Sequence, residues 1–299
     1  MQLGVHLPQV GPNATREGVL ALARRAEELD FDSLWVSDHV VVPRQVSGQY
    51  PGAGGGWGAA FPVPPDWPFL EAISTLLFAA ACTQRLLLGV SVLVVPQRNP
   101  VLTAKMLATL DVLSGGRVIF GAGIGWMSEE FAALDVPFAQ RGARTEEYLH
   151  LIKALWTEDH PAFRGRFYSL DDVGFYPKPL QRPRPPIWMG GWAEPALRRV
   201  ARLADGWHAG GPPQVLAERY QLLRRFAEEA GRDPDAIALS VRTESHLWKG
   251  GPQLALETLR RYRDIGAQHV ILVFAGRTIE LALERMEGFV RDLRPALET

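Results

Sequence analysis

The amino-acid sequence predicts an α/β fold: a (β/α)8 TIM barrel, in which eight parallel strands, each followed by a helix, close into a ring. Short apolar segments alternate with segments of helical periodicity along all 299 residues. This alternation is typical of strands that lie parallel in one sheet. A doubly wound open sheet is the competing fold, but open sheets ordinarily contain fewer strands. We therefore expect residues 1–299 to form one barrel domain.

The first half of the chain contains four expected strands, each a short apolar run. They are Gln2–Leu7, Ser33–Ser37, Leu86–Val95 and Val118–Phe120. The expected helices are a segment with Val19, Leu22, Ala26 and Leu29 at helical spacing, then Leu70–Ala81, Asn99–Leu113 and Glu146–Trp156. The third strand is apolar on both faces, as in a buried parallel sheet. Ser114-Gly115-Gly116 is a stop signal for the helix before it.

The second half repeats the same alternation. Its expected strands are Ile187–Met189, Gly206–His208, Ile237–Val241 and His269–Phe274. Its expected helices are Ala196–Leu203, Val215–Glu229, Leu254–Ile265 and a last helix with an apolar stripe from Ile279 to Leu297.

Two long segments interrupt the alternation. Residues 43–68 are rich in Gly and Pro and lie between the second strand and its helix, whereas residues 159–186 lie between the fourth helix and the fifth strand. Loops of this length in a compact domain are usually functional. We expect Pro43–Pro68 to form a lid or rim over the mouth of the barrel, beside the residues that follow strand two.

The composition favours a small molecule as the partner. The net charge is -1, which gives no basic excess for nucleic acid or an anionic membrane. No apolar run is long enough to span a bilayer, and no signal peptide is recognised at the N-terminus. Cys82 is the single cysteine and cannot form an internal disulfide, so we expect a cytoplasmic protein.

Candidate catalytic residues follow the strands, because a barrel of this kind carries its site at the carboxyl ends of the strands. Asp38 and His39 follow strand two. Histidine titrates near neutral pH, so this pair suits general acid–base chemistry, although a histidine bonded to the backbone is the structural alternative. No histidine shows metal-ligand spacing, and we expect no metal site. A serine or cysteine nucleophile motif is also absent from the sequence, so a bound cofactor would supply the chemistry.

Two glycine-rich turns are candidates for contact with that cofactor. Gly190-Gly191 precedes an expected helix, where free amides bind phosphate, or it is an ordinary strand-to-helix turn. The run from Gly121 to Trp126 is not a dinucleotide fingerprint, since Trp126 stands where that pattern needs glycine. Gly123 and its neighbours could instead pack their backbone against a flat ring, or they could serve tight strand–helix packing.

Several stretches, taken together and in order, resemble the luciferase-like monooxygenase superfamily. They are Leu34–His39, Leu93–Pro100, Leu110–Arg117 (LDVLSGGR), Gly121–Trp126, Phe167-Tyr168, Pro185–Gly191 (PPIWMGG) and Ala204–Trp207. They span nearly the whole chain, and the ordered set is far more specific than any one of them. The likeness is greatest to the branch that uses the deazaflavin coenzyme F420.

This resemblance implies a barrel with insertions, commonly a homodimer, and it assigns roles to particular residues. It places a non-prolyl cis peptide at Ser91–Val92, behind the central ring of the cofactor. It places phosphate contacts at Gly190 and Gly191, with Trp192 next, and Asp38 and His39 at the ring edge where hydride moves.

The resemblance also suggests what the substrate is not. Sugar-phosphate dehydrogenases of the F420 branch carry a glutamate where this chain has Trp126. Oxidation of glucose-6-phosphate is therefore not expected. Trp126, together with Trp57 and Trp67, instead suggests an apolar pocket that binds aromatic molecules.

Three functions compete at this stage. The first is an F420-dependent oxidoreductase that exchanges hydride with a small organic substrate. The second is a two-component monooxygenase that takes reduced FMN from a separate reductase. The third is a non-catalytic flavin-binding protein with a degenerate site. The Asp38-His39 pair and the glycine turns argue against the third.

Overall fold

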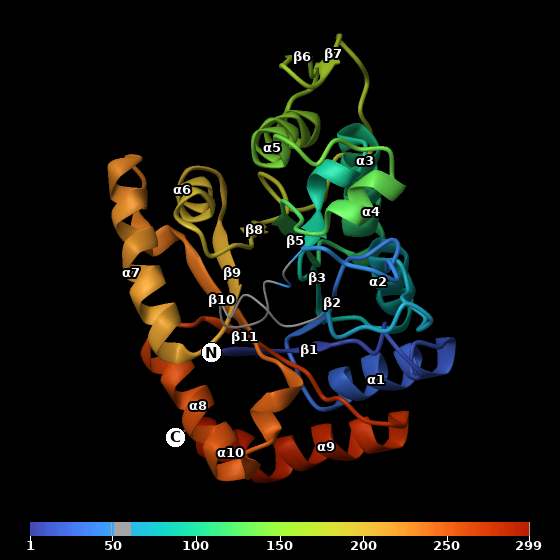
Figure 1. The fold of residues 1–299 in the computed structure, drawn as a ribbon, viewed down its shortest axis with the longest axis vertical. Helices are drawn as coiled ribbons and strands as arrows, with labels where there is room; N and C mark the ends of the chain where they lie inside the picture. The colour runs from blue at the N-terminus through green and yellow to red at the C-terminus, as the bar shows by residue number, and fades with distance from the viewer. Residues whose placement is uncertain (49, 51–60, 299) are drawn as a thin grey trace.

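A computed structural model describes residues 1–48, 50 and 61–298 of the chain. Its main sheet runs in the order β3-β2-β1-β11-β10-β9-β8-β5-β4, and a further pairing of β3 with β5 closes the ring (Figure 1). Because β3 and β4 occupy one barrel position, the described residues form an eight-membered parallel barrel with helices around it. The predicted (β/α)8 barrel is confirmed, and the open sheet is excluded.

The barrel strands fall close to the expected positions. They are β1 (Gln2–His6), β2 (Ser33–Val36), β3 (Leu87–Val90), β4 (Leu93–Val94), β5 (Val118–Gly123), β8 (Ile187–Met189), β9 (Gly206–Gly210), β10 (Ala238–Arg242) and β11 (His269–Leu272). The expected strand Leu86–Val95 is divided at Ser91 and Val92, whose peptide bond is cis as predicted. The fourth and sixth barrel strands, β5 and β9, extend further toward the mouth than expected.

Helices follow the strands and cover the outside of the barrel. They are α1 (Arg16–Glu28), α2 (Ala72–Cys82), α3 (Pro100–Ser114), α4 (Ser128–Ala133), α5 (Arg141–Thr157), α6 (Glu194–Leu203), α7 (Pro213–Glu229), α8 (Gly251–Asp264), α9 (Ile279–Asp292) and α10 (Arg294–Glu298), with 3-10 turns at Val95–Gln97, Pro234–Ala236 and Ser245–Trp248. The side chain of Asn99 caps α3, and Gly115 ends it in the left-handed region at φ 74°.

Two helical features differ from the expectation. The short helix α4 falls in a stretch for which no helix was expected. The single last helix is instead two, α9 and α10, separated at Leu293. Pro295 lies at the second position of α10 and has no N–H to continue the hydrogen-bond ladder of α9.

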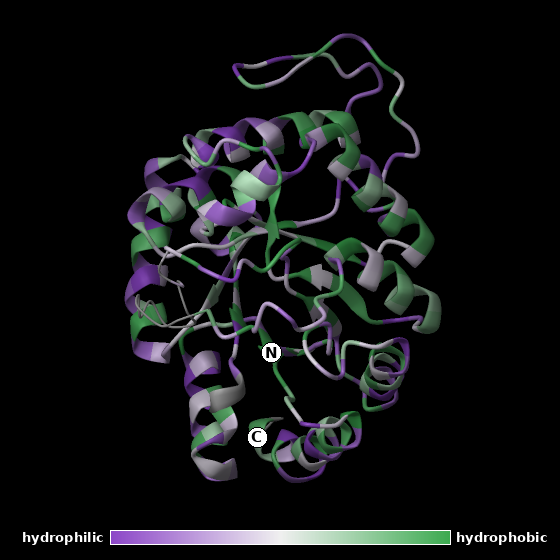
Figure 2. Ribbon diagram, turned by 45° about the vertical axis from the view of Figure 1, so that its right-hand side comes forward, coloured by the Kyte–Doolittle hydropathy of each residue, from purple (hydrophilic) through white to green (hydrophobic). Residues whose placement is uncertain are grey.

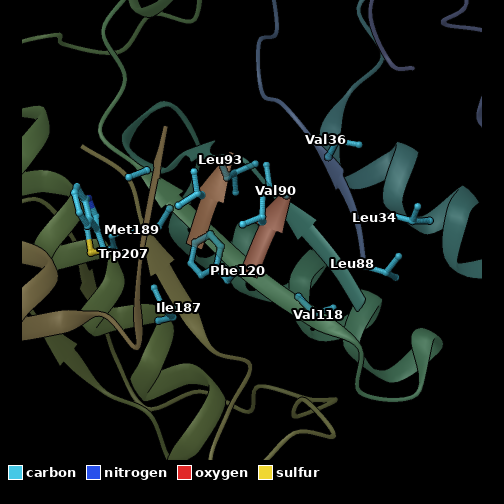
Figure 3. Packing of buried hydrophobic residues seen from close by; sticks show 14 of the residues in the cluster. Leu34, Val36, Leu88, Val90, Leu93, Val118, Phe120, Ile187, Met189 and Trp207 are labelled. Carbon is cyan, nitrogen blue, oxygen red and sulfur yellow. The ribbon is translucent and has the colours of Figure 1, made fainter. Parts of the chain in front are cut away.

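The outer layer of the core, between strands and helices, is mainly aliphatic. Strand residues that point outward are fully buried, among them Leu34, Val36, Leu88, Val90 and Phe120 (Figure 3). The helices carry hydrophobic residues on one side and polar residues on the other, whereas the strands are mostly hydrophobic (Figure 2). Burial of this apolar layer stabilises the barrel.

The inside of the barrel is packed differently, with a separate cluster of Trp35, Ile119, Trp188 and Ile271. The ring of Trp35 stacks on that of Trp188, with centroids 5.6 Å apart. Glycines on neighbouring strands make room for both rings: a Cβ on Gly206 would lie 2.6 Å from Trp188, and one on Gly4 would lie 2.8 Å from Trp35 Nε1. Indole rings thus replace the branched aliphatic layers usual in such barrels.

Both predicted insertions can be located in part. Residues 159–186 contain a two-stranded antiparallel hairpin, β6 (Phe163–Arg164) and β7 (Ser169–Leu170), which projects beyond α5 (Figure 1). In the other insertion, the described residues Tyr50, Phe61 and Trp67 line the cavity at the barrel mouth. Residues 49 and 51–60, and with them Trp57, lie outside the described part of the chain. No helix in the described part is long and apolar enough to cross a membrane.

Candidate active site

A cavity of about 1190 Å³ opens at the carboxyl ends of the strands. Its walls come from residues after β1, β2, β5, β8 and β11, from the β3–β4 break and from the end of β10. Pockets for small ligands usually measure about 300–1,000 Å³. The space therefore suits a large cofactor with a substrate beside it. Each of the site residues predicted from the sequence lines this cavity: Asp38, His39, Ser91, Val92, Gly123, Gly190, Gly191 and Trp192.

His39 is held by a buried glutamate. Its Nδ1 lies 3.1 Å from Oε2 of Glu130, a residue of α4 whose side chain is only 1% exposed. Oε1 of Glu130 accepts the N–H of Val40 at 2.6 Å, and Oε2 accepts Nε2 of Gln97 at 3.2 Å. Burial alone would raise the pKa of Glu130, but these hydrogen bonds, first that from His39, bring its pKa below the ordinary value. The carboxylate is therefore ionised at neutral pH.

This arrangement fixes how His39 can act. An ionised carboxylate accepts the Nδ1–H, which leaves Nε2 of a neutral ring free to accept a proton. Nε2 has no hydrogen-bond partner among the described residues, and the ring lines the cavity. His39 can thus take or give a proton at Nε2.

Aromatic rings surround His39 on the cavity side. Its ring centroid lies 4.8 Å from that of Phe61, 5.5 Å from Phe69 and 6.3 Å from Trp126. Tyr50 also contacts Phe61 and Trp126. The apolar aromatic wall expected from Trp126 and Trp67 is therefore present, with phenylalanines in addition.

Asp38 has a different environment from its neighbour His39. Its carboxylate receives two hydrogen bonds from Arg98, at 2.9 and 2.8 Å, and one from the N–H of Val94 at 2.8 Å. Burial raises the pKa of Asp38, while Arg98 and the Val94 amide act against that rise. The pair ties the loop after β2 to β4 and the turn after it, which supports the wall of the cavity.

The β3–β4 break forms the floor of the cavity. Oγ of Ser91 lies 2.6 Å from Nε2 of His208, and Val92 lines the cavity. A Cβ on Gly123 would overlap the side chain of Val92, and one on Gly190 would lie 3.4 Å from it. The glycines therefore make room for Val92, which presents a small apolar surface to the cavity.

The turn after β8 provides amides at the start of α6. The N–H of Gly190 is already bonded to the carbonyl of Ala122 at 3.0 Å. Those of Gly191 and Trp192 have no acceptor among the described residues. Gly191 has φ 120°, a region that favours glycine. A phosphate group at this turn would thus be bound by Gly191 and Trp192 rather than by the amide of Gly190.

Sequence reasoning assigned no role to two charged residues of the site. Glu130 is 91 positions from His39 in the chain, and it lies on the helix that was not expected. Arg242, at the end of β10, lines the cavity and donates to Oγ of Ser37 at 3.0 Å. Position at a strand end was the only signal available for Arg242. Among the described residues, no group of three or more His, Cys, Asp or Glu side chains is arranged to hold a metal ion.

Comparison with known proteins identifies the family. Residues 1–293 match the model of the luciferase-like monooxygenase family. The F420-dependent glucose-6-phosphate dehydrogenase of Kineococcus radiotolerans is 35% identical over 245 residues, which are 80% of this chain and 66% of that protein. The FMNH2-dependent dimethylsulfone monooxygenase of Pseudomonas putida is 38% identical over 144 residues, 47% of this chain and 39% of that protein.

A solved structure supports the same fold. An F420-dependent secondary alcohol dehydrogenase in complex with an F420-acetone adduct superposes with a TM-score of 0.79 at 18% identity, over 99% of this chain and 98% of that one. At this identity the likeness concerns the barrel alone. The match to the family model, in contrast, covers almost every residue. The chain therefore belongs to the luciferase-like monooxygenase family, whose members are oxidoreductases and monooxygenases.

Proposed function

We propose that the protein is an F420-dependent oxidoreductase that transfers a hydride between the deazaflavin and a small organic substrate. The observation that carries this proposal is the His39–Glu130 pair at the wall of a large cavity. Hydride exchange with a carbonyl or an alcohol needs a proton to move at the same time. A neutral histidine with a free Nε2 beside the substrate provides for that proton.

The choice of cofactor follows from the extent of the sequence likeness. The F420-dependent relative aligns with 80% of the chain, whereas the FMNH2-dependent one aligns with 47%. A two-component monooxygenase that receives reduced FMN from a separate reductase is the runner-up, supported by the higher identity of that shorter alignment. The proposal includes a homodimer, as the resemblance to the F420 branch implies, and a location in the cytoplasm, as the single cysteine suggests.

The residues present fit a flat ring that carries a phosphate tail. Val92 offers a small apolar face at the cavity floor, and the amides of Gly191 and Trp192 are available for a phosphate. When bound, F420 supplies or accepts the hydride. Asp38 holds the floor and the loop of His39 in place through Arg98 and Val94. His39 then holds or moves the proton at Nε2.

The substrate proposed from the cavity wall is apolar and unphosphorylated. Phe61, Phe69 and Trp126 lie against His39, so the part of the substrate beside the proton donor contacts aromatic rings. The resemblance places a glutamate at the position of Trp126 in sugar-phosphate dehydrogenases. We therefore expect activity with small apolar alcohols or ketones and none with glucose-6-phosphate.

Cofactor titration tests the proposal directly. The purified protein is titrated with F420 and with FMN, each oxidised and reduced, and turnover is then followed with a panel of alcohols and ketones. We expect F420 to bind more tightly and its absorbance to change with substrate. Tight FMN binding without detectable F420 binding would instead support the monooxygenase.

A further inference from the structure

Tyr50 places a hydroxyl on the aromatic wall of the cavity. Its ring contacts those of Phe61 and Trp126, and the centroids of each pair are 5.5 Å apart. The same two rings contact His39, with centroids 4.8 and 6.3 Å from the imidazole, and all four residues line the cavity. Tyr50 and His39 therefore share two ring neighbours on one wall.

The hydroxyl of Tyr50 is available to a ligand. It has no hydrogen-bond partner in the described part of the chain, and the side chain is half-buried. Burial raises the pKa of the phenol, while the charges of Arg242 and Glu244 act on that pKa in opposite directions. The phenol therefore keeps its proton at neutral pH and can donate a hydrogen bond.

Tyr50 and His39 together match the hydrogen-bonding groups of an alcohol. Neutral His39 accepts a proton or a hydrogen bond at Nε2, and Tyr50 donates at Oη. The oxygen of an alcohol can donate to the first and accept from the second. The other rings of this wall are those of Phe61, Phe69 and Trp126, which carry neither a hydroxyl nor a charge. Such rings pack well against a flat aromatic group.

We infer that the substrate is an aryl alcohol or aryl ketone and that Tyr50 donates a hydrogen bond to its reacting oxygen. The inference rests on the proposed function, since it assigns a position to the substrate of that reaction. Tyr50 keeps its proton and orients the oxygen, whereas the proton of the reaction moves at His39. Loss of the Tyr50 hydroxyl should therefore weaken the binding of molecules that carry this oxygen and leave the binding of others unchanged.

Benzyl alcohol and toluene differ by one hydroxyl and test the inference without turnover. Their dissociation constants are measured by calorimetry on protein loaded with reduced F420, which cannot accept a hydride from the alcohol. Tyr50→Phe keeps the ring. We expect it to weaken the binding of benzyl alcohol about 3- to 10-fold, the loss of one hydrogen bond between neutral groups. The binding of toluene should not change.

Tyr176→Phe is the matched control, because it removes the same atom from a residue that is 61% exposed and does not line the cavity. Both dissociation constants should keep their wild-type values. Trp126→Phe removes another donor of the wall, the indole N–H, together with ring area, so it should weaken the binding of both molecules by similar factors. If Trp126→Phe and not Tyr50→Phe lowered the preference for the alcohol, the inference would be overturned.

Three further outcomes would also overturn it. They are an unchanged preference for benzyl alcohol in Tyr50→Phe, a wild type that binds both molecules equally, and a wild type that binds neither. Thermal unfolding separates binding from folding, because the midpoint of Tyr50→Phe should equal that of the wild type when the hydroxyl makes no internal hydrogen bond.

Failure of the proposed function gives a different result. In that case the protein binds FMN and not F420, and the two dissociation constants are measured on protein loaded with reduced FMN under anaerobic conditions. Their ratio still reports whether Tyr50 binds the oxygen, because neither measurement requires hydride transfer.

Discussion

The two ends of the barrel interior are formed by the same strands, but one end is packed with side chains and the other is open. At the amino end, Trp35 and Trp188 fill the space that Gly4, Gly89 and Gly206 leave. At the carboxyl end the interior is an open cavity, and charged and polar side chains line it together with aromatic rings. Large rings at one level fill the barrel below the cavity, and the other level can hold a ligand. Substitutions at the filled end should therefore act on stability, whereas those at the open end should act on activity or on stability according to the contacts of each side chain.

The largest effect is expected at His39, in the open half. His39→Ala should lower turnover about 10²–10⁴-fold, because general acid–base catalysis contributes a factor of this size. The thermal midpoint should also fall, because the Glu130 carboxylate, 1% exposed, loses the hydrogen bond from His39, so turnover is compared at a temperature at which both proteins are folded. Steady-state turnover and thermal unfolding of the same samples measure both. Unchanged turnover in His39→Ala would show that His39 has a structural role and no catalytic one.

Asp38 lies next to His39 in the chain, yet we expect its substitution to act on stability. Asp38→Ala removes the buried partner of Arg98, a side chain that is 1% exposed, and leaves Arg98 paired with Glu71, whose side chain is 37% exposed, at 3.3 Å. Breaking a buried ion pair on one side costs about 3–5 kcal/mol. Urea denaturation measures the loss.

The matched control for Asp38 is Asp66→Ala. Asp66 pairs with Arg44 on the surface, where the side chains are 70% and 76% exposed, and exposed pairs contribute little. The urea midpoint of Asp66→Ala should therefore stay at the wild-type value. If Asp38→Ala instead lowered turnover without lowering the free energy of unfolding, Asp38 would take part in the reaction together with His39.

Glu130 should produce a smaller effect on activity than His39. Glu130→Gln keeps the shape of the side chain and removes the charge that orients the His39 ring. We expect turnover to fall about 10- to 100-fold, the loss of one charge-assisted hydrogen bond. The control is Glu129→Gln, the neighbouring residue of α4, whose carboxylate binds Ser47 at the surface. If Glu130→Gln and Glu129→Gln lowered turnover equally, the hydrogen bond between Glu130 and His39 would have no specific role in activity.

The sequence could predict the open half of the barrel only in outline. His39, Ser91 and Gly191 follow strands, and position at a strand end places a residue at the mouth. Glu130 lies on α4, beyond the turn that follows β5, and its contact with His39 depends on how α4 packs against the loop after β2. Periodicity predicts which face of an element is buried, but it does not predict such a long-range contact.

The packing of the filled half, the amino end of the barrel interior with Trp35 and Trp188, could not be predicted from the sequence either, for a related reason. The apolar run Ser33–Ser37 predicts a strand, but Trp35 could pack inside or outside the barrel. Only the glycines on the adjacent strands decide this, because Gly4 and Gly89 lie next to Trp35 in space. The contacts of Arg242 with Ser37 and Ser91 likewise join segments far apart in the chain, which no local pattern reports.

The smallest expected effect concerns the filled half and its histidines. His208 stacks on Trp35 with centroids 4.9 Å apart, and burial, followed by the charge of Arg242, lowers its pKa to about 3. Burial lowers the pKa of His269 to about 4. These rings stay neutral in the folded protein, whereas in the unfolded chain a histidine takes up a proton below about pH 6.5. The unfolded state then binds more protons, so the free energy of unfolding falls as the pH drops from 6.5 toward 4.

Each such histidine should remove roughly 2 kcal/mol of stability at pH 5 relative to pH 6.5 and above. His208→Asn cannot take up that proton, so urea denaturation at pH 7, 6 and 5 should show a shallower loss for this variant than for the wild type. His160→Asn is the control, because the side chain of His160 is 85% exposed and its variant should follow the wild-type slope. Parallel curves for His208→Asn and the wild type would show that His208 is protonated in the folded barrel. In that case the floor of the cavity would carry a second positive charge beside Arg242, and the division between a neutral, packed half and a charged, open half would no longer hold.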